Sequence, residues 1–248
     1  MTSQTVARAA AVSRRVLFTT LVVTACSGCA THLAADPRDP LEQFNRGAFG
    51  FNDALDRAIL KPAATVYRDV TPSLVRAGIS NFLGNLDDVW SFVNTLLQFN
   101  AQGAAQNFMR VNVNTVFGLG GMLDVASEMG IERQREDFGQ TLGAWGVPSG
   151  PYIVLPFFGP STLRDTVAIP VNTRGDIVSA INHIPTRNSF KALDLMDVRS
   201  SLLSAGDTLD QVALDKYTFV RDAFLQRRRN AVYNGNPPDA PDGAIKAP

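Results

Sequence analysis

The chain has 248 residues, 45% of them hydrophobic, and its 23 basic and 23 acidic side chains leave no formal net charge. This composition suffices for one sizeable core and gives no support to nucleic-acid binding, which favours a basic surface. After residue 25, no apolar run approaches the roughly 20 residues of a bilayer-spanning helix. The only two cysteines, Cys26 and Cys29, lie three positions apart near the N-terminus, which excludes a disulfide framework.

The N-terminus has the three parts of a bacterial signal peptide. Arg8, Arg14 and Arg15 form a basic region, residues 16–25 are apolar but too short to span a bilayer, and small residues lead into Cys26. Residues 23–26 (VTAC) resemble the lipobox, where signal peptidase cuts before a cysteine that carries diacylglycerol, commonly with a further acyl chain on the new N-terminus. We predict a signal peptide over 1–25, lipidation of Cys26 and a tether over 26–38.

Two alternatives to this anchor are open. The segment could be an ordinary secretory signal with a cysteine near its cleavage site. Cys29 is the rival lipidation site, but this choice would put Cys26 where the lipobox expects a branched aliphatic residue. Ser27 follows Cys26, and lipoproteins kept in the inner membrane typically carry Asp there, so the sequence favours the outer membrane. Loss of three arginines with the signal leaves a mature net charge of about −3.

The first helix is predicted directly after the tether. Asp39 reads as its N-cap and Pro40 as its first residue, and apolar residues then recur every three or four positions as far as Ile59, before Lys61-Pro62 ends the helix. Because this amphipathic helix closely follows the lipid, we predict that it lies at the membrane interface. Core packing could use the same stripe. The predicted interface residues are Phe44, Phe51, Asn52 and Leu55.

Further helices follow in order. Thr71-Pro72 begins one that runs to about residue 99 and is divided near Gly84, and others are expected at 104–117, 138–145, from Ser161, at 190–203 and at 209–233. Residues 146–160 are irregular, because four prolines deny a ladder to a possible short strand at 152–155. The tail over 234–248 has no apolar period and is predicted to be disordered.

No pattern in the sequence indicates catalysis or a metal site. His32 and His183 have no metal-ligand spacing, and the serine of residues 146–150 lies one place late for a nucleophile elbow. Residues 118–121 lack the third glycine of a dinucleotide loop. The pair Asp87-Asp88 is interpreted as a solvated helix face. We therefore expect no enzyme and no cofactor beyond the acyl anchor.

The helix predicted over 104–117 carries a narrow polar stripe. Asn107, Arg110 and Asn114 step by three and four residues, whereas most other positions are apolar. Polar groups on such a helix must face a partner or water. One interpretation is a core helix whose stripe hydrogen-bonds a neighbour. The other is a stripe that lines an aqueous path through a lipid-embedded body.

Several motifs occur together in one order: DPLEQFNR (39–46), SNFLGNL (80–86), NVNTVFGLGG (112–121), FGQTLG (138–143) and the segment 150–165. The chain is therefore similar to the MlaA/VacJ family of outer-membrane lipoproteins, densely over 39–165 and weakly over 217–228. Between 171 and 210 no family pattern is clear.

This resemblance implies an all-α fold, with a single ring-like helical domain over 39–233 and an amphipathic central channel. Such a protein lies in the inner leaflet of the outer membrane and faces the periplasm. It takes phospholipids that have strayed into the outer leaflet and passes them to a periplasmic carrier protein, which maintains lipid asymmetry. The implied partners are membrane lipid and a trimeric porin, with phospholipid as the transported ligand.

Together with the resemblance, the polar stripe predicts the wall of the lipid path. The predicted lining residues are Asn107, Arg110, Asn114, Gly118, Gly120 and Gly121. The competing function is a structural or assembly lipoprotein that docks porins or envelope machinery without transferring lipid. A phospholipid-cleaving enzyme is disfavoured for want of a nucleophile and base.

Overall fold

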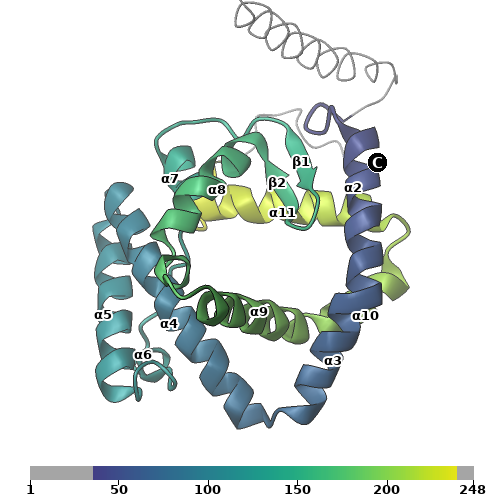
Figure 1. Ribbon diagram of the computed structural model, residues 1–248. Helices are drawn as coiled ribbons and strands as arrows, with labels where there is room; N and C mark the ends of the chain where they lie inside the picture. The colour runs from purple at the N-terminus through teal and green to yellow at the C-terminus, as the bar shows by residue number, and fades with distance from the viewer. Residues whose placement is uncertain (1–35, 239–248) are drawn as a thin grey trace, which may run out of the picture.

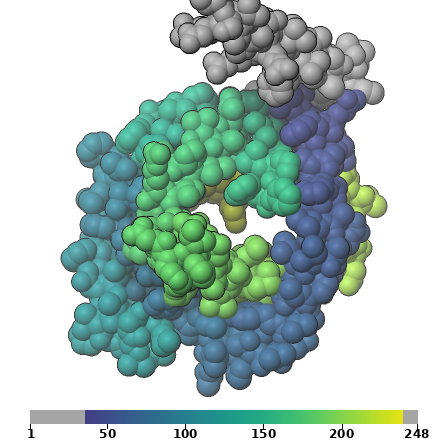
Figure 2. All heavy atoms as spheres, viewed as in Figure 1, coloured from purple at the N-terminus to yellow at the C-terminus, as the bar shows by residue number. Residues whose placement is uncertain are grey.

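The structure is a computed structural model that describes residues 36–238. The predicted signal peptide, Cys26, most of the tether and residues 239–248 lie outside the described residues. Helices joined end to end form a ring, with a β-hairpin at one point of its circumference (Figure 1). In the space-filling view an opening passes through the centre of this ring (Figure 2). The helical, ring-like fold expected from the resemblance is thus confirmed.

One side of the ring is a continuous helical rod that consists of α2 (Glu42–Leu55), a π-helical turn η1 (Asp56–Leu60) and α3 (Lys61–Val70). The prediction that Lys61-Pro62 ends the first helix is therefore wrong. Pro62 lies in the first turn of α3, where a missing N–H is tolerated, and the Lys61 N–H reaches back five residues to the Asp56 carbonyl. The helix also starts later than predicted, because Leu41 and not Asp39 is its N-cap.

The opposite side consists of two long antiparallel helices, α4 (Ser73–Leu97) and α5 (Ala101–Phe117), followed by the short helix α6 (Val125–Glu128). Gly84 does not divide α4, as the sequence analysis expected. It is buried, and a Cβ there would lie 2.7 Å from the Arg133 guanidinium, so this glycine permits a close contact within an unbroken helix. α5 and α6 lie on the outside of α4, which separates them from the opening (Figure 1).

The segment after α7 (Phe138–Ala144) contains a hairpin that the sequence analysis rejected. β1 (Tyr152–Leu155) pairs antiparallel with β2 (Gly159–Thr162), with Val154 opposite Pro160. The Val154 N–H points away from β2 and donates to the Asn45 side chain at 2.8 Å. Because Pro160 thus lies at a position where no ladder hydrogen bond is needed, it does not break the pairing.

The remaining elements close the ring: α8 (Leu163–Gly175), a short 3₁₀ turn η2 (Val178–Ala180), α9 (Ile184–Ser201), α10 (Leu203–Val212) and α11 (Lys216–Val232). The helix expected at 209–233 is therefore two helices, and Asp215 caps the second by accepting the Tyr217 and Thr218 N–H groups. Thr162, not Ser161, caps α8. Residues 234–236 form a turn that is hydrogen-bonded to the end of α11.

Burial in this ring is inverted relative to a water-soluble protein. Among the described residues, buried polar and charged side chains outnumber buried apolar ones, and many large apolar side chains are exposed. The main apolar cluster is small and contains Ala48, Tyr152, Val154 and Tyr217. Large exposed apolar area usually marks contact with lipid or protein. Across residues 36–238, no single helix combines the length and apolarity needed to cross a membrane.

Candidate functional site

Arg110, at the centre of the polar stripe, is buried in a network of charges. Its side chain is 0% exposed, and Nη2 donates to both carboxylate oxygens of Asp124 at 2.8 and 2.9 Å. Nε faces Asp88 of α4 at 3.4 Å, and Nη1 donates to the Ile131 carbonyl. This arginine therefore connects α5 to α4, to the N-cap of α6 and to the segment that follows α6.

The two asparagines of the stripe also have partners inside the protein. Asn107 donates to the Gln134 carbonyl at 2.9 Å and accepts from the Gln134 N–H at 3.3 Å. Asn114 donates to Asp124 at 3.0 Å and accepts from the Ala126 N–H at 2.8 Å. The stripe thus fixes the chain from residue 124 to residue 134 against α5.

The prediction that Asn107, Arg110 and Asn114 line a lipid path is wrong for this structure. The three side chains are at most 1% exposed, and α5 lies outside α4, away from the opening (Figure 1). A fully satisfied buried side chain offers no surface to a lipid. The alternative interpretation, a stripe that hydrogen-bonds its neighbours, describes what the structure shows.

The glycines predicted beside the stripe form the turn that ends α5. A Cβ on Gly118 would lie 2.3 Å from the Leu123 carbonyl oxygen, and Gly121 has φ +98° and packs against the Asn85 side chain. Gly120 also has positive φ but is exposed. Gly118 and Gly121 thus permit close backbone approach, as predicted, but the approach is to the next turn and to α4, whereas nothing lies within 4 Å of a Cβ on Gly120.

Of the pair interpreted as a solvated helix face, Asp87 is exposed but Asp88 is not. Asp88 is 0% exposed and accepts from Arg110 and Arg133. Burial raises the pKa of Asp88, and the two arginines offset this only in part. Burial acts in the same direction on Asp124, but hydrogen bonds from Ser127, Arg110 and Asn114 lower its pKa below the usual carboxyl range.

The residues predicted to lie at the membrane interface have two different roles in the structure. Phe44 and Phe51 are 56% and 46% exposed, and they line an apolar groove of about 480 Å³ together with the hairpin residue Phe157. Leu55 is partly buried. Asn52 has another role, because it donates to the Leu155 carbonyl at 2.9 Å and accepts from the Phe157 N–H at 2.8 Å.

Asn45 lies two helical turns before Asn52 and binds the same hairpin. It is 0% exposed, donates to the Tyr152 carbonyl at 3.0 Å and accepts from the Val154 N–H. It also donates to Asp39 at 2.7 Å. Asp39 in turn accepts from Tyr217 and Arg221 of α11. The start of the chain, the hairpin and the last helix are thus joined through buried polar groups.

A cavity of about 550 Å³ is lined by residues of α4, α7, α8 and α11 and of the segment before α7. Its wall combines charges of both signs with the Trp90 ring, whose Nε1 donates to Asn172 at 3.0 Å. A Cβ on Gly175 would lie 2.3 Å from that ring, so α8 packs directly on Trp90. The residues that decide its chemistry are Asp87, Trp90, Arg135, Asp176, Arg227 and Arg228.

This cavity was not predicted from the sequence. Asp87 and Arg135 are exposed to solvent, yet their surroundings come from helices far apart in the chain. The one local signal was the pair Asp87-Asp88 on a predicted helix. Successive residues of a helix point about 100° apart, so two neighbouring carboxylates cannot both lie on the same face.

The electrostatics of Asp87 give a testable pH dependence. The cavity wall removes water from one side of the Asp87 carboxyl, although the residue as a whole is exposed, and this partial desolvation raises its pKa to about 6. Asp194, Asp176 and Asp88 add to this shift, while Arg135 opposes it. A carboxyl group with a raised pKa in the folded state binds protons that the unfolded chain releases. Its ionised form therefore destabilises the fold above about pH 6, and this penalty disappears as the pH falls toward 4.

We expect Asp87→Asn to raise the melting temperature at pH 8 and to have little effect at pH 4. Thermal unfolding followed by circular dichroism at both pH values measures the difference. Asp69→Asn is the control, because hydrogen bonding to Arg68 lowers the pKa of this exposed carboxyl. An equal gain from Asp87→Asn at both pH values would contradict the assignment.

Comparison with known proteins agrees with the fold. A model of the MlaA lipoprotein family matches residues 37–231. The intermembrane phospholipid transport system lipoprotein MlaA of Escherichia coli K12 is 38% identical over 218 residues, covering 85% of this chain and 84% of that protein. Its Haemophilus influenzae namesake is 34% identical over 239 residues, covering 90% and 92%.

A solved structure, described as the structural basis for maintenance of bacterial outer membrane lipid asymmetry, also matches. It superimposes with a TM-score of 0.69 at 36% identity, covering 80% of this chain and 99% of that one. An uncharacterized protein of Rickettsia bellii is 36% identical over 195 residues, or 78% of this chain and 76% of that protein. The chain therefore belongs to the MlaA lipoprotein family.

Proposed function

We propose that this chain is an outer-membrane lipoprotein that removes phospholipids from the outer leaflet and passes them to a periplasmic carrier protein, which maintains outer-membrane lipid asymmetry. The observation that carries the proposal is a ring with an opening at its centre (Figure 2), with large apolar side chains exposed and polar side chains buried. This inverted arrangement suits a body immersed in lipid.

Such a ring gives a phospholipid head group a route that hydrocarbon alone does not. A charged head group is costly to move through an apolar medium, whereas the acyl chains remain favourable there. Polar groups on the wall of such an opening would admit the head group, while the tails stay against the apolar outer surface. No covalent bond has to form or break in this process.

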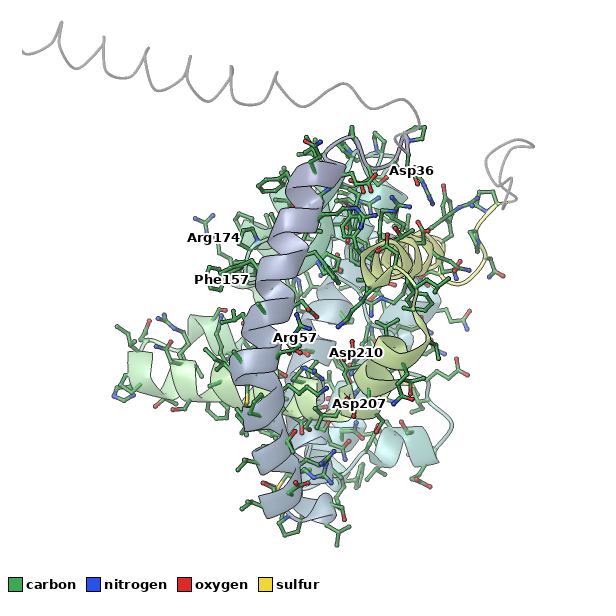
Figure 3. The ribbon with its side chains drawn as sticks, turned by 90° about the vertical axis from the view of Figure 1, so that its right-hand side faces the viewer. Asp36, Arg57, Phe157, Arg174, Asp207 and Asp210 are labelled. Atoms are coloured by element: carbon green, nitrogen blue, oxygen red, sulfur yellow. The ribbon has the colours of Figure 1, made fainter. Side chains whose placement is uncertain are left out.

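We further propose that the ring lies in the inner leaflet, with α10 and α11 toward the periplasm. Figure 3 shows Phe157 on one side of α2 and the charged helices α10 and α11, with Asp207 and Asp210, on the other. Lys61 pairs with Asp207 at 2.7 Å, and Lys216 bridges Asp53 and Asp210 at 2.7 Å each. The charged side suits water, and the aromatic side suits the acyl chains.

The anchor belongs to the same proposal. Acylation of Cys26 would hold the ring on the membrane, because two or three acyl chains bind far more persistently than one. Cys26→Ala is expected to leave an unprocessed or soluble chain. Intact-mass measurement of the membrane-extracted protein checks this, and acyl chains found on Cys29 instead would overturn the assignment.

The proposed partners are a trimeric outer-membrane porin and a periplasmic phospholipid carrier protein. The exposed apolar surface that suits lipid also suits a porin wall. Native mass spectrometry of the gently extracted protein is expected to show both a porin trimer and bound phospholipid.

The decisive variant is one that disturbs the opening and spares the outer surface. Asn52→Leu removes both hydrogen bonds that hold the hairpin tip, which borders the opening (Figure 1). We expect this variant to stay anchored and porin-bound but to lose normal lipid clearance, measured by outer-leaflet lipid labelling and detergent sensitivity.

The matched control is Asn112→Leu on α5, because Asn112 is exposed and bonds only its own helix, at the Phe108 carbonyl. An assembly lipoprotein would respond in the opposite way. It would tolerate Asn52→Leu and fail when exposed docking faces change.

A further inference from the structure

The cavity between α4, α7, α8 and α11 has side chains of opposite charge on its wall that have no partner in the protein. Within residues 36–238, the Asp87 carboxylate accepts no hydrogen bond and forms no ion pair. The same holds for the guanidinium groups of Arg135 and Arg227, although all three residues line the cavity. Groups of both positive and negative charge are thus available to bind a ligand.

The other charged groups of this wall are already occupied. Arg228 pairs with Asp137 and Asp165, Gln98 and Gln140 donate to Glu136, and Asp176 accepts from Ser179 and faces Lys191 at 3.7 Å. Asp87 and Arg135 both line the cavity, yet no ion pair joins them. The unpaired groups are one carboxylate and two guanidinium groups.

This set of groups matches a particular class of ligand. Guanidinium groups bind phosphate oxygens through several N–H donors, and a carboxylate accepts hydrogen bonds from a primary ammonium group. A ligand that presents phosphate and ammonium close together would satisfy all of these groups at once.

We propose that this cavity is a head-group site that prefers zwitterionic phospholipids with a primary amine, with Asp87 binding the ammonium and Arg135 and Arg227 binding the phosphodiester. The inference rests on the proposed function and specifies its substrate. A glycerol head group offers the same phosphodiester but leaves Asp87 unpaired.

The electrostatics of the cavity support this assignment. Partial desolvation by the cavity wall, together with neighbouring carboxylates, raises the pKa of Asp87 to about 6, so its surroundings disfavour the ionised form. A ligand cation placed there would relieve that repulsion. Any anionic lipid would meet the same carboxylates without the compensating ammonium.

The test uses the full acylated chain, purified in detergent and equilibrated with vesicles of equal parts phosphatidylethanolamine and phosphatidylglycerol. Bound lipid is then counted by mass spectrometry. The wild type is expected to be enriched in phosphatidylethanolamine. Asp87→Asn should lower the bound ratio of phosphatidylethanolamine to phosphatidylglycerol about tenfold, as for loss of one charge-assisted hydrogen bond, and Asp87→Glu should largely retain it.

Arg135→Gln should instead reduce both lipids alike, because both share the phosphodiester. Arg174→Gln is the matched control, since Arg174 is exposed and not among the residues of the cavity wall. Circular dichroism verifies that each variant is folded, which is expected because both Asp87 and Arg135 are exposed.

The outcomes separate this inference from the proposed function. A wild type that binds no phospholipid contradicts both. A wild type that binds phospholipid with a ratio unchanged by Asp87→Asn contradicts the head-group site alone. If soluble phosphoethanolamine binds the wild type as tightly as the lipid does, the ligand is a free metabolite and the lipid assignment is overturned.

Discussion

Arg110→Leu is expected to lower the free energy of unfolding by about 3–5 kcal/mol, the usual cost of removing one partner from a buried ion pair. Leucine would leave the fully buried Asp88 without one of its two arginines and remove both bonds to Asp124. It would also leave the Ile131 carbonyl without its donor. Denaturant unfolding of the detergent-solubilised protein, followed by circular dichroism, measures the change.

Two variants make this result interpretable. Arg174→Leu removes an exposed arginine and is expected to change stability by less than about 0.5 kcal/mol. Arg110→Lys keeps the charge but cannot contact both oxygens of Asp124, so an intermediate loss is expected. If Arg110→Leu keeps wild-type stability yet fails to clear phospholipid, the original prediction that this stripe lines the lipid path would be restored.

The polar stripe shows how far a single helix can be interpreted from its sequence. Its spacing correctly predicted that Asn107, Arg110 and Asn114 share one face, because helical geometry determines that directly. It did not reveal what the face contacts. Asp88 lies 22 residues before Arg110 and Asp124 lies 14 residues after it, and nothing in either local pattern marks them as partners.

For the hairpin and for the rod of α2, η1 and α3, the local sequence signals were clear but led to the wrong prediction. Prolines argued against a strand at 152–155 and for a helix end at 61–62. Asn45, more than 100 residues away, supplies a hydrogen bond to the strand from outside the ladder, and a π-helical turn accommodates Pro62. The hydrogen bond from Val154 to Asn45 and the π-helical turn both depend on the folded structure, so local residue propensities do not predict them.

The overall ring was predictable only through resemblance, because an all-helical pattern is compatible with many arrangements. The candidate head-group cavity was not predictable from any one segment of the sequence. Its charged residues come from α4, from the segment before α7 and from α11, and each alone looks like an ordinary surface charge. What distinguishes them is the lack of a protein partner, which only the folded arrangement reveals.

Closure of the ring depends on Arg228, and Arg228→Met is expected to lower the free energy of unfolding by about 3 kcal/mol, as for other partly buried charge networks. Its Nε donates to Asp165 at 2.9 Å, while Nη1 and Nη2 donate to Asp137 and Nη1 also to Gln140. These bonds attach the C-terminal half of α11 to α7 and α8. Hydrogen exchange should show faster opening of α11, together with loss of lipid clearance.

Arg229→Met is the neighbouring control, since Arg229 is exposed and its side chain bonds only the Pro238 carbonyl.

Gly139→Ala tests the same junction from the side of α7, because a Cβ there would lie 2.5 Å from Asp165 and 2.8 Å from the Arg228 guanidinium. Both Arg228→Met and Gly139→Ala should therefore loosen α11, although they change opposite partners. Unchanged protection of α11 in both variants would mean that the contacts of its N-terminal half, such as those of Asp39 with Tyr217 and Arg221, suffice to close the ring.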